Sequence, residues 1–158
     1  MKYQSNRNYK SNDCIMTPIN ICKDIITHFK PYGKILEPCK GTGNFLKVMD
    51  ADWCEITEGI DFLTHNKHYD WIITNPPWSK IRIFLNHSME LADNIIFLIT
   101  INHLWTKARM GDILGMKFGI KEIYLIDAPK ELNNSGFQVG CIYLKRDYTG
   151  KIKLTNFY

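Results

Sequence analysis

Apolar and polar positions alternate along the chain with two different periods. Ile21, Ile25 and Phe29 recur at helical spacing after Thr17-Pro18, which predicts a helix with Thr17 as its N-cap and Pro18 at its first position. The same spacing predicts further helices at 44–49, 81–91 and 106–118. Shorter apolar runs predict strands at 34–37, 52–56, 69–74, 94–101, 121–127 and 137–146, with an edge strand at 151–154.

This alternation predicts an α/β fold with a mostly parallel, doubly wound sheet that helices cover on both faces. Residues 1–12 are polar and show no periodicity, so we expect a flexible arm there and a single domain over 13–158. Ligands of such sheets bind at the carboxyl ends of the strands. The turns after 34–37 and 69–74 both follow such ends, so we expect their residues to share one crevice.

Composition and charge narrow the class of protein. The chain is 45% hydrophobic and 23% charged, which is ordinary for a globular domain. No apolar run approaches the roughly 20 residues of a membrane span, and the first residues contain no apolar signal segment, so we expect a cytoplasmic protein. Five scattered cysteines without a Cys-x-x-Cys pair argue against disulfides and a zinc site, and no metal is expected. The net charge of +4 fits an anionic partner.

The turn after the first predicted strand reads Glu37-Pro38-Cys39-Lys40-Gly41-Thr42-Gly43. Glycines allow a ligand to approach the backbone closely, because no Cβ intervenes. An acidic residue at the strand end suits a cationic amino-acid group better than a pyrophosphate, which prefers bare helix N-terminal amides. Glu55 follows 18 residues later, and we expect it to accept hydrogen bonds from ribose hydroxyls, with Glu58 as the alternative.

The tetrapeptide Asn75-Pro76-Pro77-Trp78 directly follows another predicted strand. Two prolines in series fix φ and withhold two backbone donors, which leaves carbonyl acceptors. The side-chain oxygen of Asn75 and the carbonyl of Pro76 can accept the two N–H bonds of a planar amino group such as that of adenine, so that its lone pair is exposed. Trp78 offers a face on which a purine can stack, worth about 1–3 kcal/mol. This pattern predicts catalysis by placement, at an exocyclic amino nitrogen.

Together, the acidic-Pro-x-x-Gly-x-Gly turn and the Asn-Pro-Pro-aromatic turn resemble the class I S-adenosylmethionine-dependent N6-adenine DNA methyltransferases. The motif order is the one that places cofactor binding before catalysis, and the compact length is similar to that of phage and prophage members. The resemblance implies a Rossmann-like sheet with an antiparallel last strand, S-adenosylmethionine as cofactor, and methyl transfer to N6 of adenine in DNA. The residues with implied roles are Thr17, Pro18, Glu37, Pro38, Gly41, Gly43, Glu55, Asp61 and Phe62 for the cofactor and Asn75, Pro76, Pro77 and Trp78 for catalysis.

The resemblance also implies roles for two further segments. The stretch Gly59-Ile60-Asp61-Phe62 is similar to the one that binds the cofactor adenine in this family. It follows Glu55 so closely that we expect the second helix and third strand of the family's fold to be shortened. Phe137 stands where related enzymes carry an aromatic residue opposite the extruded base, so it would complete a sandwich with Trp78. Alternatively, Phe137 begins the strand at 137–146 and packs into the core.

The substrate stays open among several classes. Asn-Pro-Pro-aromatic loops also occur in enzymes that methylate amino groups of ribosomal or transfer RNA, and in those that methylate glutamine in release factors. A non-catalytic module that binds nucleic acid or cofactor is a further alternative. We expect DNA as the partner. Because no segment beyond the arm and the loop at 128–136 could read base edges, we also expect weak sequence selectivity, a very short site, or specificity supplied by a homodimer or partner protein.

Overall fold

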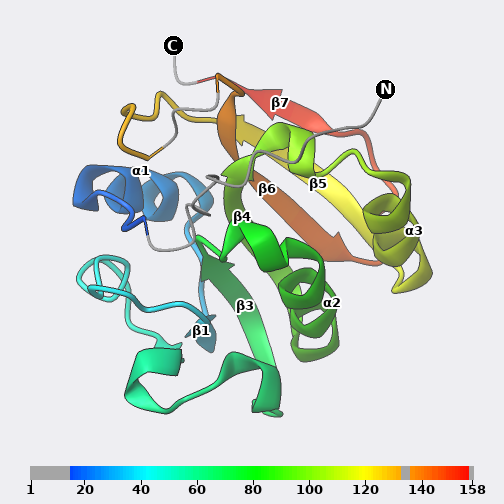
Figure 1. The fold of residues 1–158 in the computed structure, drawn as a ribbon. Helices are drawn as coiled ribbons and strands as arrows, with labels where there is room; N and C mark the ends of the chain where they lie inside the picture. Colours follow the sequence, from blue (N-terminus) through cyan, green and yellow to red (C-terminus); the bar gives the residue numbers. More distant parts are fainter. Residues whose placement is uncertain (1–14, 133–135, 157–158) are drawn as a thin grey trace, which may run out of the picture.

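The computed structural model describes residues 15–132 and 136–156, so the predicted arm at 1–12 lies outside the described residues. A seven-stranded sheet with the order β2-β1-β3-β4-β6-β5-β7 forms its centre (Figure 1). The helices are α1 (Ile19–Phe29), α2 (Ile81–Leu91) and α3 (Lys107–Gly115). The strands are β1 (Ile35–Glu37), β2 (Asp52–Trp53), β3 (Tyr69–Thr74), β4 (Ala92–Thr100), β5 (Phe118–Leu125), β6 (Val139–Arg146) and β7 (Lys153–Thr155).

Strand direction confirms the predicted mixed sheet. The pairs β2–β1, β1–β3 and β3–β4 are parallel, whereas β6 runs antiparallel to both of its neighbours, β4 and β5. The edge strand β7 pairs parallel with β5. The carboxyl ends of β1, β3 and β4 therefore lie at one edge of the sheet, together with the amino end of β6. The turn motifs singled out in the sequence follow two of these ends.

The central strand β4 shows why the sheet needs helices on both faces. Ile95, Phe97 and Ile99 belong to the core beneath α2 and α3, whereas Ile96 and Leu98 belong to the core beneath α1. Successive side chains of a strand point to opposite faces, so a continuous apolar run is buried only if both faces are covered. Figure 1 shows α1 on one side of the sheet and α2 and α3 on the other.

The segment between β2 and β3 is as short as expected. Within the described residues 54–68, the regular elements are two 3-10 turns, η1 (Ile56–Glu58) and η2 (Phe62–Thr64), and no third parallel strand forms. An isolated bridge between Glu55 and Ile60 folds the chain back directly after β2. Gly59, with φ of 80°, makes this reversal possible. The shortened second helix and third strand are thus confirmed.

Several predicted elements differ from the structure. The strand expected at 52–56 ends at Trp53, the helix expected at 106–118 spans Lys107–Gly115, and the strand expected at 121–127 spans Phe118–Leu125. The helix expected at 44–49 is wrong: the bonds from Lys47 N to Gly43 O and from Met49 N to Phe45 O are not consecutive, so hydrogen-bonded turns replace a helix. Thr17 is not the N-cap of α1, because Pro18 occupies that position without a side-chain cap. The strand expected at 137–146 begins only at Val139.

The helices of the described ranges, 15–132 and 136–156, are short relative to a bilayer. None of them combines the length and the apolar character that crossing a membrane requires.

Candidate active site

A pocket of about 490 Å³ opens at the carboxyl ends of β1 and β3. Its volume is typical of sites that bind small molecules. Four segments far apart in the sequence form its wall: the chain before α1, the turn after β1, the residues after β2, and the loop after β3. The side chains and backbone around it come from Ile15–Thr17, Pro38–Thr42, Asn44, Phe45, Glu55–Thr57, Asp61–Leu63, Asn75, Pro77, Lys80 and Phe84.

The turn after β1 needs glycine at two positions. Gly41 and Gly43 have φ of 52° and 79°, in the left-handed region that side chains with a Cβ rarely adopt. A Cβ on Gly41 would also lie 2.5 Å from Met16 Sδ, so the segment before α1 packs directly on this glycine. The Gly41 N–H donates to Glu55 Oε2 at 2.8 Å, and the Lys40 N–H donates to the Cys54 carbonyl. These bonds tie the turn to the end of β2.

Glu37 lies behind this wall rather than in it. Its side chain is 1% exposed, and Oε1 accepts a hydrogen bond from the Cys39 N–H at 2.9 Å. Burial raises the pKa of Glu37 to about 8, and the nearby Thr74 hydroxyl and the Cys39 N–H offset this only in part. Neither Glu37 Oε2 nor Thr74 Oγ1 makes a hydrogen bond of acceptable geometry within the described residues. A buried carboxyl group with an unpartnered oxygen is suited to ionise when a cationic group binds nearby.

Glu55 faces the pocket with an ionised carboxylate. Burial raises its pKa, but hydrogen bonds from the Thr57 hydroxyl, the Thr57 N–H and the Gly41 N–H together lower it. Three of roughly four acceptor positions of the carboxylate are thereby used, which leaves Oε2 able to accept one more hydrogen bond. Glu58, the alternative, instead pairs with Lys40 and does not line the pocket. The geometry thus favours Glu55 as the acceptor.

Asp61 and Phe62 close the pocket on the side of η2. Asp61 Oδ1 accepts a hydrogen bond from the Leu63 N–H at 2.9 Å, so its second oxygen keeps its acceptor capacity. Phe62 is 2% exposed and packs on Phe84 of α2, with ring centroids 5.1 Å apart. Ile56, which is 67% exposed, also lines the pocket. The apolar side chains of Phe62 and Ile56, with the acceptor oxygen of Asp61, suit a flat apolar ligand that has a polar edge.

The chain before α1 links the pocket to the loop after β3. The Asn44 side chain donates to the Thr17 carbonyl at 2.9 Å, and Asn75 Nδ2 donates to the Ile15 carbonyl at 3.2 Å. Thr17 is buried and lines the pocket, whereas Pro18 does not. This short extended segment therefore depends on contacts with both predicted motifs.

The loop after β3 carries the predicted catalytic residues. Asn75 and Pro77 line the pocket, and Pro76 is buried. Asn75 Oδ1 accepts a hydrogen bond from Trp78 Nε1 at 3.1 Å. The Trp78 ring packs against both hydrophobic cores, and its centroid lies 6.0 Å from that of His103, which follows β4. Trp78 therefore stands at the pocket's edge, toward the end of β4.

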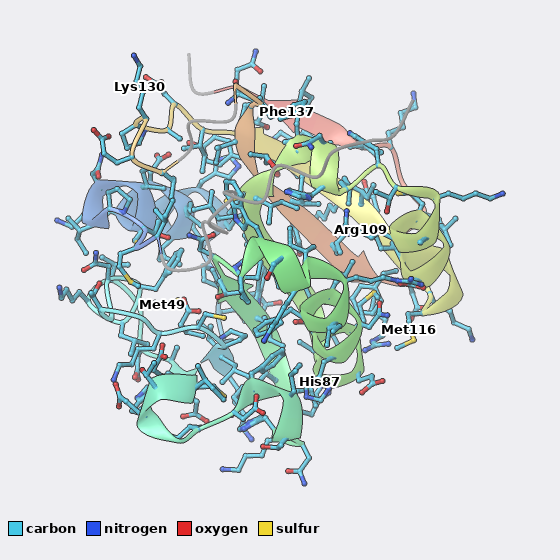
Figure 2. The ribbon with its side chains drawn as sticks, viewed as in Figure 1. Met49, His87, Arg109, Met116, Lys130 and Phe137 are labelled. Atoms are coloured by element: carbon cyan, nitrogen blue, oxygen red, sulfur yellow. The ribbon has the colours of Figure 1, made fainter. Side chains whose placement is uncertain are left out.

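Phe137 precedes β6 at the same edge of the sheet. Its side chain is 56% exposed, so the interpretation that it packs into the core is wrong. Figure 2 shows Phe137 where β6 begins, Lys130 on the loop between β5 and β6, and Arg109 on α3.

Burial and the charge of Arg109 lower the pKa of His103, so this ring beside Trp78 is neutral at pH 7.

The structure brings most of the predicted site residues into one pocket wall, but not all of them. Thr17, Pro38, Gly41, Glu55, Asp61, Phe62, Asn75 and Pro77 line it, whereas Pro18, Glu37, Gly43, Pro76, Trp78 and Phe137 do not. Sequence reasoning missed Ile15, Met16, Cys39, Lys40, Thr42, Asn44, Phe45, Ile56, Thr57, Leu63, Lys80 and Phe84. Most of the missed residues adjoin a predicted one, so adjacency was an available signal. Met16 adjoins Thr17, whereas Ile15 had no such signal, because an extended segment carries no periodicity.

Clusters of side chains that could bind a metal ion are absent from the described residues. Residues 15–132 and 136–156 contain no group of three or more His, Cys, Asp or Glu side chains that could hold a metal ion. The described cysteines Cys22, Cys39, Cys54 and Cys141 form no disulfide with one another.

Comparison with known proteins identifies relatives by structure only. No protein-family model matches the chain, and no curated protein sequence does so. A protein from Listeria monocytogenes with a provisional assignment as a class I S-adenosylmethionine-dependent methyltransferase is similar, with a TM-score of 0.66 and 16% identity. The match covers 95% of this chain and 68% of that protein.

Two further solved structures carry different substrate assignments. A provisionally assigned RNA methyltransferase from Pyrococcus horikoshii has a TM-score of 0.62 and 13% identity, and the match covers 82% of this chain and 83% of that one. The M protein of the type I restriction enzyme EcoKI has a TM-score of 0.58 and 12% identity, and the match covers 85% of this chain. This chain spans only 44% of the length of that M protein. At these identities the likeness establishes the fold, which is the Rossmann-like fold of the class I methyltransferases.

Proposed function

We propose that this chain, which has the class I methyltransferase fold, is an S-adenosylmethionine-dependent enzyme that methylates N6 of adenine in DNA. The observation that carries the proposal is the position of Asn75, which lines the same pocket as the Gly41 turn and Glu55. An amide side chain in the wall of a cofactor pocket is suited to orienting a planar amino group for methyl transfer. The fold and the Asn-Pro-Pro-Trp loop support the reaction, and the substrate class rests on the loop.

The residues around the pocket fit S-adenosylmethionine. Glu55 would accept hydrogen bonds from the ribose hydroxyls, and Asp61 with Phe62 would hold the adenine. Thr17 would contact the methionine end, and the buried Glu37, which holds a proton at neutral pH in the free protein, would ionise beside the cationic amino group of the bound cofactor. The unpartnered Glu37 Oε2 supports this assignment, because a buried carboxylate is stabilised by a nearby cation. Because Gly41 has no Cβ, Met16 can pack on the turn in this wall.

The catalytic contribution of the chain is placement of the target amino group. S-adenosylmethionine supplies, when bound, an electrophilic methyl group on a sulfonium. Asn75 Oδ1 and the Pro76 carbonyl would accept the two N–H bonds of the adenine amino group, which concentrates its lone pair on the nitrogen. Trp78 and Phe137 would provide aromatic faces for the base outside its stack. No strong base is needed, since hydrogen-bond acceptors at fixed positions polarise the nitrogen.

DNA is proposed as the polymer, and specificity is proposed to come from outside the catalytic domain. The net charge of +4 favours an anionic substrate. The segments expected from the sequence to reach base edges are the arm and the loop at 128–136, and both are short. A homodimer or partner protein would supply the remaining base contacts, or the recognition site is very short.

Tritiated S-adenosylmethionine incubated with DNA, RNA or protein tests the proposal. We expect label in DNA, recovered as N6-methyldeoxyadenosine after digestion to nucleosides. Label only in RNA would replace DNA by RNA as the substrate, and label in glutamine would assign the chain to the protein methyltransferases. Binding of the cofactor without transfer to any of the three would indicate a non-catalytic module.

A further inference from the structure

The side-chain amide of Asn75 is held between two hydrogen-bond partners that each act in one direction only. Its Oδ1 accepts from Trp78 Nε1 at 3.1 Å, and its Nδ2 donates to the Ile15 carbonyl at 3.2 Å. An indole N–H can only donate, and a backbone carbonyl can only accept. A half-turn of the amide would set donor against donor and acceptor against acceptor. Both partners therefore select the same orientation.

We propose that Trp78 is a positioning residue whose indole N–H fixes the Asn75 amide with its oxygen available to the target amino group. The inference rests on the proposed function of this loop. An amide oxygen carries two lone pairs, so Oδ1 can keep the indole hydrogen bond and accept one more. The two amide orientations have nearly the same shape, and in the wrong one an NH2 group would face the amino group that needs an acceptor.

The surroundings of Trp78 suit a fixed donor. The partly buried Trp78 ring packs against the buried side chains of both cores. It does not line the cofactor pocket. Packing therefore determines where the indole N–H points. The second partner, Ile15, belongs to the pocket wall, so the amide orientation also depends on the segment that the cofactor would contact. A phenylalanine at position 78 would keep an aromatic face but would lack the donor.

Steady-state kinetics of Trp78→Phe separate positioning from base stacking. We expect kcat to fall about 3- to 10-fold, which corresponds to the loss of one hydrogen bond in the transition state, while KM for DNA and for S-adenosylmethionine changes less than twofold. Trp71→Phe is the matched control, because Trp71 lies on the adjoining strand β3 and its buried Nε1 has no hydrogen-bond partner within the described residues. It should leave kcat unchanged at temperatures where the variant is folded.

A spectroscopic measurement tests the hydrogen bond without reference to activity. The chain contains four tryptophans, so a 1H–15N spectrum shows at most four indole N–H signals, and Trp78→Phe identifies one of them by its disappearance. In Asn75→Ala this same signal should shift and its hydrogen exchange should accelerate, while the signal of Trp71 stays in place. An unchanged Trp78 signal in Asn75→Ala would overturn the inference.

The kinetic outcomes distinguish the inference from the proposed function. A wild-type protein that transfers no methyl group would refute the proposed function itself. An active wild type with an unaltered kcat in Trp78→Phe would refute the positioning role alone. A raised KM for DNA with an unaltered kcat would equally overturn it, because that result assigns Trp78 to binding of the base.

Discussion

Replacing Glu37 by glutamine should remove a large pH dependence of stability. The carboxyl group of Glu37 has a pKa of 4.5 in the unfolded chain and about 8 in the fold, because burial penalises its charged form. Between these values the folded protein holds a proton that the unfolded chain has released. The free energy of unfolding therefore falls as the pH rises, and the contribution present below pH 4.5 is lost as the pH passes 8.

The size of this effect follows from the shift. At 1.36 kcal/mol per pKa unit, a shift from 4.5 to about 8 corresponds to a loss of about 5 kcal/mol across the window. This is an upper bound, since water that enters the crevice would stabilise the charged form. It is nonetheless a large fraction of the 5–15 kcal/mol that stabilises an ordinary domain. Glutamine has the same shape, still accepts from the Cys39 N–H, and does not titrate.

Urea unfolding at a series of pH values from 4.5 to 8.5 measures the effect directly. The difference in the free energy of unfolding between Glu37→Gln and the wild type should be near zero at pH 4.5. It should grow in favour of the variant by several kcal/mol by pH 8, since the wild type alone loses stability over this range. Glu55→Gln is a control of opposite sign when the series is extended to about pH 3: the lowered pKa of Glu55 stabilises the fold above its unfolded pKa of 4.5, and this contribution is lost as the pH falls below that value. A pH-independent difference between Glu37→Gln and the wild type would refute the reasoning.

Three further outcomes are expected. The Kd of Asn75→Ala for S-adenosylmethionine, measured by calorimetry, should lie within threefold of the wild-type value, while kcat should fall about 100-fold. An unchanged kcat would contradict the role of Asn75. Gly119→Ala should lower the free energy of unfolding by about 2–3 kcal/mol in urea, because its Cβ would lie 2.0 Å from the Tyr148 carbonyl oxygen. Gly111→Ala, which has open space around its Cβ in α3, should instead raise the free energy of unfolding by about 0.5–1 kcal/mol. Equal effects of the two substitutions would exclude the steric argument. Phe137→Ala should raise KM for DNA about 10-fold with little change in kcat, and an unaltered KM would remove it from the base site.

The parts of the fold that were predictable depend on periodicity and on strong turn residues. The apolar run of β4 and the helical spacing of α2 specify their elements within two residues, because burial on one or two faces leaves a regular pattern. The segment at 44–49 has a similar pattern, yet it forms turns because it must follow the left-handed Gly43 and keep Asn44 bonded to the Thr17 carbonyl. Local propensity cannot anticipate such a tertiary contact.

The candidate site, like the fold, was predictable only in part. Glu55 and Asp61 line one pocket because the chain reverses at Gly59; the short interval between them predicted the shortened helix and strand but not this reversal. The hydrogen bond between Trp78 and Asn75 and the contact of Asn75 with Ile15 could not be read from the sequence. The Asn75–Ile15 contact depends on how two segments 60 residues apart meet, and the Trp78–Asn75 bond depends on how the Trp78 ring packs against the two cores, neither of which a local pattern encodes.

The most direct test of the central claim is mass spectrometry of DNA nucleosides after incubation with S-adenosylmethionine that carries a trideuterated methyl group. We expect trideuterated N6-methyldeoxyadenosine with the wild-type protein and about 100-fold less with Asn75→Ala. Absence of labelled N6-methyladenine from both DNA and RNA would contradict the account, as would an equal yield from the two proteins.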